Sequence, residues 1–332
     1  MCAAVKANWN PPVEVLDLRH FSSTDLRPVL EEESRLWSEE LSWDYSQSAE
    51  MILRYVDARI LPGYVAMERG RIDGYAFFVY EGTKAVIGDL YARRSSAHRN
   101  AAGESSIEMR LIKHVIETLQ RSPGVQRIEA QLLLHASGSV TRPFQQAGFR
   151  QHRRLFMTLP LKGSAPPEPQ VKAQSQKFQL RRWTENDYQH AAAIITACYR
   201  DHIDSDINDQ YRTTSGSMRF LNNIVRFPGC GLFDTQASFV AIDKETRSPA
   251  GLILCSRVKP NVGHITQICV LPQYRGHGVG EKLLAANSAE LRGRGFDMLS
   301  LTVTEANAGA VHLYRRLGYN VEKVFDAFVW EG

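Results

Sequence analysis

The sequence predicts an α/β protein of the α+β kind, made of two tandem units with the same order of strands and helices. Runs of β-branched and aromatic residues alternate with helical patterns along the whole chain. A stretch rich in Pro, Gln, Ser and Lys, residues 161–177, has no apolar periodicity and separates two parts of similar size. A chain of 332 residues is also long for one compact core. We therefore expect a first domain at 1–160, a linker at 161–177 and a second domain at 178–332.

Periodicity and turn residues define the elements of the second half. Strands are predicted at 178–183, 238–243, 250–257, 263–270, 298–304 and 321–330, and helices at 187–199, 218–226, 279–292 and 308–317. The first half repeats this order. Its strands are predicted at 13–18, 63–68, 74–80, 85–91, 125–133 and 152–159, and its helices at 25–41, 105–119 and 141–147. Internal duplication explains the repetition economically.

A glycine-rich turn at 272–280 is the most informative feature, because it joins a β-branched strand directly to a helix. Gly276, Gly278 and Gly280 leave the backbone accessible to an anion, and the following helix directs its free N–H groups to the same place. The turn therefore predicts a ligand that carries phosphate. It lacks the Gly-Lys-Ser/Thr ending of a nucleoside-triphosphate loop. Its Gly-x-Gly-x-Gly spacing and late position weaken a dinucleotide site, which stays a distant alternative.

Two motifs carry a family resemblance. Residues 273–278, Gln-Tyr-Arg-Gly-His-Gly, preceded by Val-Leu-Pro, resemble the Gln/Arg-x-x-Gly-x-Gly/Ala signature of the GNAT superfamily of acyl-CoA-dependent N-acetyltransferases. Residues 307–319, from Asn307 to Tyr319, are similar to the Asn-x-x-Ala-x-x-Leu-Tyr-x-x-x-Gly-Phe/Tyr signature of the same family. The motifs occur in the family's order, and the two-unit layout is similar to the tandem-domain members related to mycothiol synthase.

The resemblance implies a fold and a reaction. Each unit would contain a mixed, mostly antiparallel sheet of six to seven strands, flanked by about four helices, with splayed strands four and five. The second unit would transfer an acyl group from acetyl-CoA to a primary amine of a small molecule or peptide, by direct attack in a ternary complex. The residues implied in acetyl-CoA binding are Ile268, Cys269, Val270, Gln273, Tyr274, Arg275, Gly276, His277, Gly278, Val279, Gly280 and Asn307.

The resemblance also assigns catalytic roles. Tyr314 occupies the position of the general acid that protonates the leaving thiolate, although a core tyrosine is the plain alternative. Asn307 either contacts the ligand or caps a helix, and Cys269 is expected to be a small buried hydrophobe rather than a nucleophile.

The general base is less well defined, because the family's strand-five Glu position holds Thr302. His264 is the first candidate, since an imidazole suits base catalysis at neutral pH. Glu305 is the second, and a water chain ordered by Thr302 and Gln267 is the third.

The first unit is expected to be a degenerate copy. Arg99-Asn100-Ala101-Ala102 replaces the glycine-rich turn, and Glu104 stands opposite Gly280, where a carboxylate repels pyrophosphate. Phe144 stands opposite Tyr314, and Ser137 opposite Asn307. Weak acyl-CoA binding through Gly103 is the alternative.

The segment 201–217 falls where the family places its acceptor wall. Its Asp201, Asp204, Asp206 and Asp209 would attract a cationic amine, or would form a merely solvated loop. It lacks the Gly and terminal Glu of an EF-hand.

Composition limits the partners. A net charge of +4 without a basic block does not imply nucleic acid. Five scattered cysteines, none in a Cys-x-x-Cys pair, suggest neither disulfides nor a metal site and fit a reducing cytoplasm. No apolar leader or membrane span is apparent. The sequence leaves the oligomeric state open. A non-catalytic acyl-CoA-binding regulatory protein is the alternative function.

Overall fold

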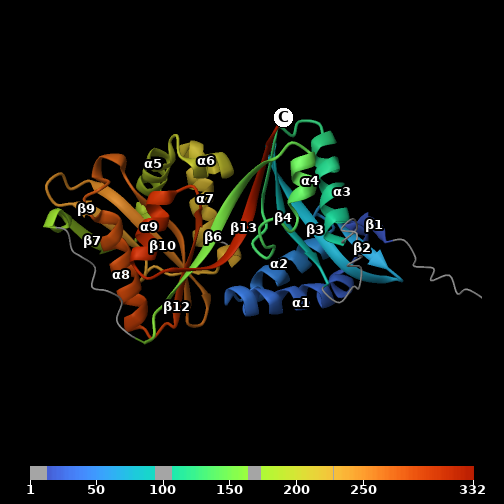
Figure 1. Cartoon of the computed structure of the whole chain (residues 1–332), viewed down its shortest axis with the longest axis horizontal. Coiled ribbons are helices and arrows are strands. Elements are labelled where there is room, and N and C mark those ends of the chain that lie inside the picture. The colour runs from blue at the N-terminus through green and yellow to red at the C-terminus, as the bar shows by residue number, and fades with distance from the viewer. Residues whose placement is uncertain (1–12, 94–106, 164–172, 227) are drawn as a thin grey trace, which may run out of the picture.

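The chain folds around a single large sheet. A computed structural model describes residues 13–93, 107–163, 173–226 and 228–332. Among these residues thirteen strands form the sheet, in the order β1-β2-β3-β4-β5-β13-β6-β12-β11-β10-β9-β7, with β8 attached to β10. Neighbouring strands are antiparallel except for β4–β5 and β11–β12, which are parallel. The predicted fold class, mixed and mostly antiparallel sheets flanked by helices, is confirmed (Figure 1).

The first half contains the predicted elements and one additional helix. Its elements are β1 (Glu14–Asp17), α1 (Ser23–Leu41), α2 (Ser46–Asp57), β2 (Gly63–Glu68), β3 (Arg71–Glu81), β4 (Lys84–Ala92), α3 (Ile107–Arg121), β5 (Arg127–Gln131), α4 (Thr141–Gln146) and β6 (Arg150–Pro160). The sequence did not predict α2. Five of its residues are buried, and its apolar face packs with α1 on the sheet.

The second half follows the same order. Its elements are β7 (Phe178–Arg182), α5 (Tyr188–Tyr199), α6 (Ile203–Ile207), α7 (Thr214–Arg226), β8 (Leu232–Phe233), β9 (Phe239–Asp243), β10 (Pro249–Lys259), β11 (Val262–Val270), α8 (Val279–Gly293), β12 (Met298–Thr304), α9 (Ala308–Arg316) and β13 (Asn320–Glu331). The segment 201–217, which was expected to be a loop, contains α6 and a 3-10 turn at Asp209–Arg212.

The final strand of each half lies in the other half's part of the sheet. β6 pairs with β12 along its length, from Met298↔Pro160 to Thr304↔Arg154. β13 pairs with β5 from Ala327↔Gln131 to Glu331↔Arg127, and β6 and β13 pair with each other. Figure 1 shows these two strands side by side in the middle of the molecule. The halves have thus exchanged their last strands, which joins the two expected sheets into one.

Alternation along the strands gives each half a core on both faces of the sheet. In the second half, α8 and α9 cover the face that carries Ile253 and Ile265, while α5 and α7 cover the face that carries Leu252 and Leu254. In the first half, α3 covers one face and α1 with α2 the other. A further cluster joins the halves at Leu41, Trp43, Phe156, Val258, Val262 and Phe325. None of the helices in the described ranges is both long and apolar enough to cross a membrane.

Candidate active site

The site begins where two parallel strands separate. β11 and β12 are paired only from Val262↔Met298 to Ile265↔Leu301, although β11 continues to Val270 and β12 to Thr304. A bulge helps them diverge, because Thr266 is the extra residue where β11 passes from Ile265↔Cys255 to Gln267↔Leu254. The predicted splay of strands four and five is therefore present, and it leaves one edge of β11 unpaired with β12 beyond Ile265.

The glycine-rich turn lies next to this opening. After a short 3-10 turn at Pro272–Tyr274, Gly276 and Gly278 adopt left-handed φ values of 79° and 81°. Gly278 is the N-cap of α8 and contributes no capping side chain. The first N–H groups of α8 have no partner within the helix, so the turn presents free donors at the positive end of the helix dipole.

The opening and the turn belong to one cavity of about 690 Å³. Twelve of the predicted site residues line it: Tyr314, His264, Ile268, Cys269, Val270, Tyr274, Arg275, Gly276, Gly278, Val279, Gly280 and Asn307. Gln273, His277 and Glu305 do not belong to its lining. The volume lies within the ordinary range for a small-molecule or cofactor site.

Charged side chains near the turn are mostly engaged with the protein. Arg275 donates to the carbonyl oxygens of Val270 (3.3 Å) and Cys198 (2.9 Å), so its guanidinium ties the turn to the end of α5. Arg316, which the sequence analysis did not single out, lines the cavity and forms an ion pair with Glu281 at 2.9 Å. The Arg316 guanidinium thus balances the Glu281 carboxylate in the first turn of α8.

Tyr314 and Asn307 both face the cavity from α9. Tyr314 is buried, which raises the pKa of its hydroxyl above the ordinary value, with Asp204 and Cys269 adding to the shift. It therefore holds its proton at neutral pH. Asn307 caps α9 by accepting a hydrogen bond from the backbone N–H of Ala310 at 3.3 Å. Its Nδ2 lies 3.3 Å from Nε2 of His202, so the cap also faces the cavity.

His264 is a poor match for the base that the sequence suggested. It is only 6% exposed, its ring lies against Trp43 with centroids 4.8 Å apart, and its Nδ1 is 2.9 Å from the Ser300 hydroxyl. Burial lowers the pKa of His264 to about 3. An imidazole with so low a pKa is too weak a base to deprotonate an ammonium group.

The other suggested bases differ in position. Glu305 pairs with the exposed Arg153 at 3.3 Å, outside the cavity lining. Thr302 and Gln267 do line the cavity. The side-chain oxygen of Gln267 accepts hydrogen bonds from the Tyr199 hydroxyl (2.7 Å) and from the Ile268 backbone N–H (3.1 Å).

Cys269 lies in the cavity wall beside Cys198. A hydrogen bond with the Cys198 thiol, together with burial, raises the pKa of Cys269 well above the usual value. A thiol held protonated is a poor nucleophile, which agrees with the expectation of a small buried hydrophobe.

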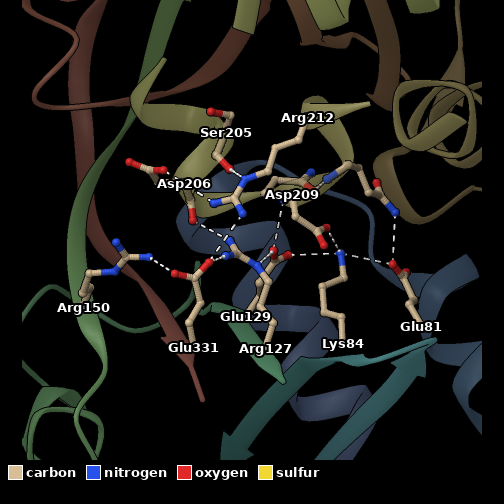
Figure 2. A network of polar contacts seen from close by, with 12 residues as sticks. Glu81, Lys84, Arg127, Glu129, Arg150, Ser205, Asp206, Asp209, Arg212 and Glu331 are labelled. Carbon is tan, nitrogen blue, oxygen red and sulfur yellow. Dashed lines mark hydrogen bonds and ion pairs between the residues drawn. The ribbon is translucent and has the colours of Figure 1, made fainter. Parts of the chain in front are cut away.

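The acidic segment 201–217 packs against the first half of the chain. Figure 2 shows the network, in which Lys84 at the start of β4 contacts Asp209 (2.6 Å), Glu81 (3.2 Å) and Glu129 (3.3 Å). Arg127 of β5 pairs with Glu129 and Glu331 and donates to the carbonyl oxygen of Asp206. The segment is therefore neither a free acceptor loop nor a merely solvated one.

Only one of the four aspartates of this segment lines the cavity. Asp204 accepts a hydrogen bond from the Thr304 hydroxyl, and its Oδ2 lies 3.5 Å from Nδ1 of His202, which also lines the cavity. Asp206 and Asp209 are used in the network, and Asp201 is exposed. Sequence reasoning identified the segment but missed His202, because nothing in its local pattern separates it from a surface histidine.

The first half also contributes to the wall. Arg154 of β6 and Gln131 of β5 line the cavity, and Arg154 donates to the Gln131 side-chain oxygen at 3.0 Å. A smaller hollow of about 250 Å³, which includes Lys84 and Glu129, shares Gln131 and Asn208 with the cavity. These contributions depend on the exchange of β6, which no local sequence signal indicates.

The equivalent opening in the first half contains the protein's own side chains. Pairing of β4 with β5 ends at Ile87↔Ala130. Beyond it, Asp89 accepts a hydrogen bond from Tyr45 at 2.6 Å, and His135 contacts the carbonyl oxygen of Leu90 at 2.7 Å. Phe144 is fully buried and stacks on Phe328, with ring centroids 3.9 Å apart.

Arg99 to Ala102, Gly103 and Glu104 lie outside the described residues. Ser137, opposite Asn307, donates to the Asp326 carboxylate at 2.8 Å. Within the described ranges, no group of three or more His, Cys, Asp or Glu side chains is arranged to hold a metal ion.

Comparison with known proteins gives one family. Residues 197–319 match the model of the acetyltransferase (GNAT) family. The mycothiol acetyltransferase of Salinispora arenicola is 32% identical over 183 residues, which cover 52% of this chain and 53% of that protein. The mycothiol acetyltransferase of Thermobifida fusca is 28% identical over 193 residues, covering 53% and 56%. The chain thus spans about half the length of these curated relatives.

Solved structures share the whole fold. A GCN5-related N-acetyltransferase from Sphaerobacter thermophilus aligns with a TM-score of 0.66 at 17% identity, over 96% of this chain and 95% of that one. A tandem GNAT protein from the clavulanic acid biosynthesis pathway aligns with a TM-score of 0.59 at 15% identity, over 96% and 98%. At 17% and 15% identity these alignments show a shared fold of both halves and carry no further argument.

Proposed function

Because this chain belongs to the GNAT family of acetyltransferases, with a tandem layout, we propose that its second half transfers an acetyl group from acetyl-CoA to a primary amine. The observation that carries the proposal is the single cavity that joins the splayed β11–β12 opening, the glycine-rich turn and Tyr314. A protein that only binds acyl-CoA needs the turn, but it does not need a protonated tyrosine at the opening.

The residues present fit acetyl-CoA. Gly276 and Gly278, both with positive φ, and the free N–H groups at the start of α8 would hold the pyrophosphate. Arg316 would offset the Glu281 carboxylate beside them. The unpaired edge of β11 from Ile268 to Val270 would pair with the pantetheine arm. The bound thioester would supply the activated acyl group.

Amide formation makes a C–N bond and breaks a C–S bond. A first proton must leave the ammonium group before attack, and a second must be delivered to the thiolate. The proton that the nitrogen loses after attack then restores the group that delivered the second. Tyr314 is suited to deliver the second proton, because burial keeps its hydroxyl protonated at neutral pH. Its position in the cavity wall on α9, near Asn307, supports this role.

For the first proton we propose His202 in place of His264. His202 is a cavity-lining imidazole, 25% exposed at its side chain, whose ring lies edge-on to Tyr199 with centroids 5.2 Å apart. Its Nδ1 accepts a hydrogen bond from the Asp204 backbone N–H at 3.2 Å, and its Nε2 lies beside the Asn307 amide at 3.3 Å. A proton taken up at Nε2 would place a cation beside the Asp204 carboxylate, whose Oδ2 is 3.5 Å from Nδ1. The Asp204 carboxylate is in turn held by the Thr304 hydroxyl. A water ordered by Thr302 and Gln267 remains the alternative route.

The first test is calorimetric titration of acetyl-CoA into the wild type and into Gly278→Glu. We expect one site per chain, abolished by the variant, because a side chain at φ 81° is strained and a carboxylate repels phosphate. Two sites would give the first half a binding function, and no binding would refute the proposal. Binding without turnover of any amine would favour the acyl-CoA-binding regulatory alternative.

The base is tested separately in turnover assays. We expect His202→Gln to lower kcat/KM for the amine by about 100-fold at neutral pH, with recovery at high pH as the free amine becomes abundant. His190→Gln, at an exposed position on α5, is the matched control. An equal loss at every pH would argue that His202 has a structural role only.

A further inference from the structure

Among the described residues, Arg154 is the cavity-lining arginine that has neither a carboxylate nor a backbone carbonyl beside its guanidinium. Three arginines line the cavity, and two of them are engaged: Arg316 pairs with Glu281, and Arg275 donates to two backbone carbonyls. Arg154 contacts only neutral side chains, namely Gln131 at 3.0 Å and Thr302 at 3.5 Å. Its Nε is buried without a hydrogen-bond partner. Among the residues that the structure describes, no carboxylate lies within ion-pair distance of its guanidinium.

A partly buried, uncompensated guanidinium is costly to fold around. Its neighbour in sequence shows the ordinary alternative, because Arg153 reaches outward and pairs with Glu305 at 3.3 Å. The Arg154 side chain instead reaches the Thr302 hydroxyl on β12, at 3.5 Å, and both side chains line the cavity. An anionic ligand group in the cavity would balance the charge of this guanidinium.

A carboxylate of the protein lines the same cavity without pairing with Arg154. Asp204 is held by Thr304, two residues beyond Thr302 on β12, and adjacent positions on one strand face are about 7 Å apart. Both charges act on Tyr211, whose pKa is raised by burial, further raised by Asp204 and lowered by Arg154. The cavity therefore carries separate anchors for a cation and an anion, near enough for one small acceptor to reach both.

From this arrangement we infer that the acceptor is an amine that also carries an anionic group, bound by Arg154 while its amine lies at His202 and Asp204. The inference rests on the proposed acetyltransferase function and adds a substrate class to it. It also gives the first half a role in the reaction, because Arg154 belongs to β6 and reaches the cavity only through the strand exchange. Arg154 is a specificity-determining residue in this scheme and takes no part in proton transfer.

The test compares acceptors in matched pairs. Glycine, β-alanine and 4-aminobutyrate are each assayed beside their carboxamides, with taurine as a sulfonate, in the wild type, Arg154→Gln and Arg153→Gln. The readout is the ratio of kcat/KM for acid over amide, so differences in amine basicity cancel between enzymes. We expect Arg154→Gln to lower this ratio by about 10- to 100-fold, as expected for loss of a charge-assisted hydrogen bond. Arg153→Gln, 53% exposed, should leave it unchanged.

Binding is measured as well as turnover, so that the two proposals fail separately. Each acid is titrated calorimetrically into the CoA-saturated full chain, with the KM for acetyl-CoA and the thermal midpoint as controls for folding. Tighter binding of acids than amides in the wild type, lost in Arg154→Gln, supports the inference even if turnover is slow. An unchanged ratio in Arg154→Gln, or absence of binding by every acid, overturns it. Failure of acetyl-CoA itself to bind overturns the acetyltransferase proposal instead.

Discussion

Replacing His264 by Gln should make the protein more resistant to acid, and the size of the effect follows from the burial of the imidazole. His264 is 6% exposed, enclosed by Trp43 and Phe156 and bonded to Ser300. Its pKa is about 3 in the folded chain, against an ordinary value of 6.5 when unfolded. Between these values the unfolded chain binds one more proton at this position than the folded chain does, so stability rises with pH. The contribution of neutral His264 to the free energy of unfolding is fully present above pH 6.5 and is lost as the pH falls toward 3.

Linkage gives the magnitude. From pH 7 to pH 5 the free energy of unfolding should fall by about 2 kcal/mol through His264 alone, since the unfolded imidazole protonates and the folded one does not. Gln cannot titrate and retains an amide that can bond to Ser300. Urea unfolding at pH 7 and pH 5 gives the change in the free energy of unfolding for wild type and for His264→Gln. Subtracting the two changes isolates the contribution of His264, because the other titrating groups contribute equally to both. His190→Gln is the control substitution.

Two results would refute this reasoning. The first is an equal loss of stability in wild type and His264→Gln between pH 7 and pH 5, which would mean that the imidazole is accessible to solvent. The second is titration of the His264 imidazole proton signals near pH 6 in NMR spectra of the folded protein. In that case His264 would return as a candidate general base, since its position in the cavity wall is otherwise suitable.

Two more predictions concern chemistry and assembly. Tyr314→Phe should lower kcat by about 100-fold or more, because the proton donor to the thiolate is lost. The dissociation constant for acetyl-CoA, measured by calorimetry, should stay unchanged. An unchanged kcat would show that Tyr314 is only a core residue. Asp209→Asn should lower the free energy of unfolding by about 1–3 kcal/mol in urea titrations, because it weakens the contact with buried Lys84, which retains Glu81 and Glu129. Asp201→Asn is its exposed control, and equal stability of the two variants would show that the Lys84 contact is energetically neutral.

Local chemistry determines how much the sequence could predict. The bounds of β2 and β12 and the start of α8 agree with prediction, because strand alternation and the glycine turn are encoded in consecutive residues. The helix α2 was missed, since it follows Tyr45, which provides no side-chain cap to signal its start. The segment 201–217 was read as a loop because its helix α6 has only five residues.

Features that join distant segments could not be predicted. β6 and β13 have similar apolar patterns, so by sequence either strand could pair with β5 or with β12. Only the assembled structure shows that β13 pairs with β5 and β6 with β12. The low pKa of His264 depends on Trp43, far away in sequence. For the same reason the pattern around Arg154 and His202 gave no sign that they line one cavity.

The strand exchange also sets the order in which the protein can be completed during synthesis. The edge of β5 remains open until residues 320–331 have been made, because its neighbour β13 comes from the far end of the second half. β6 in turn must wait for β12 and β13. An exposed strand edge invites pairing with another chain, and contacts between such distant segments form slowly. The nascent first half should therefore be the stage most prone to aggregation. Cutting the chain between β6 and β7 would deprive β5 of its neighbour β13 and β12 of its neighbour β6.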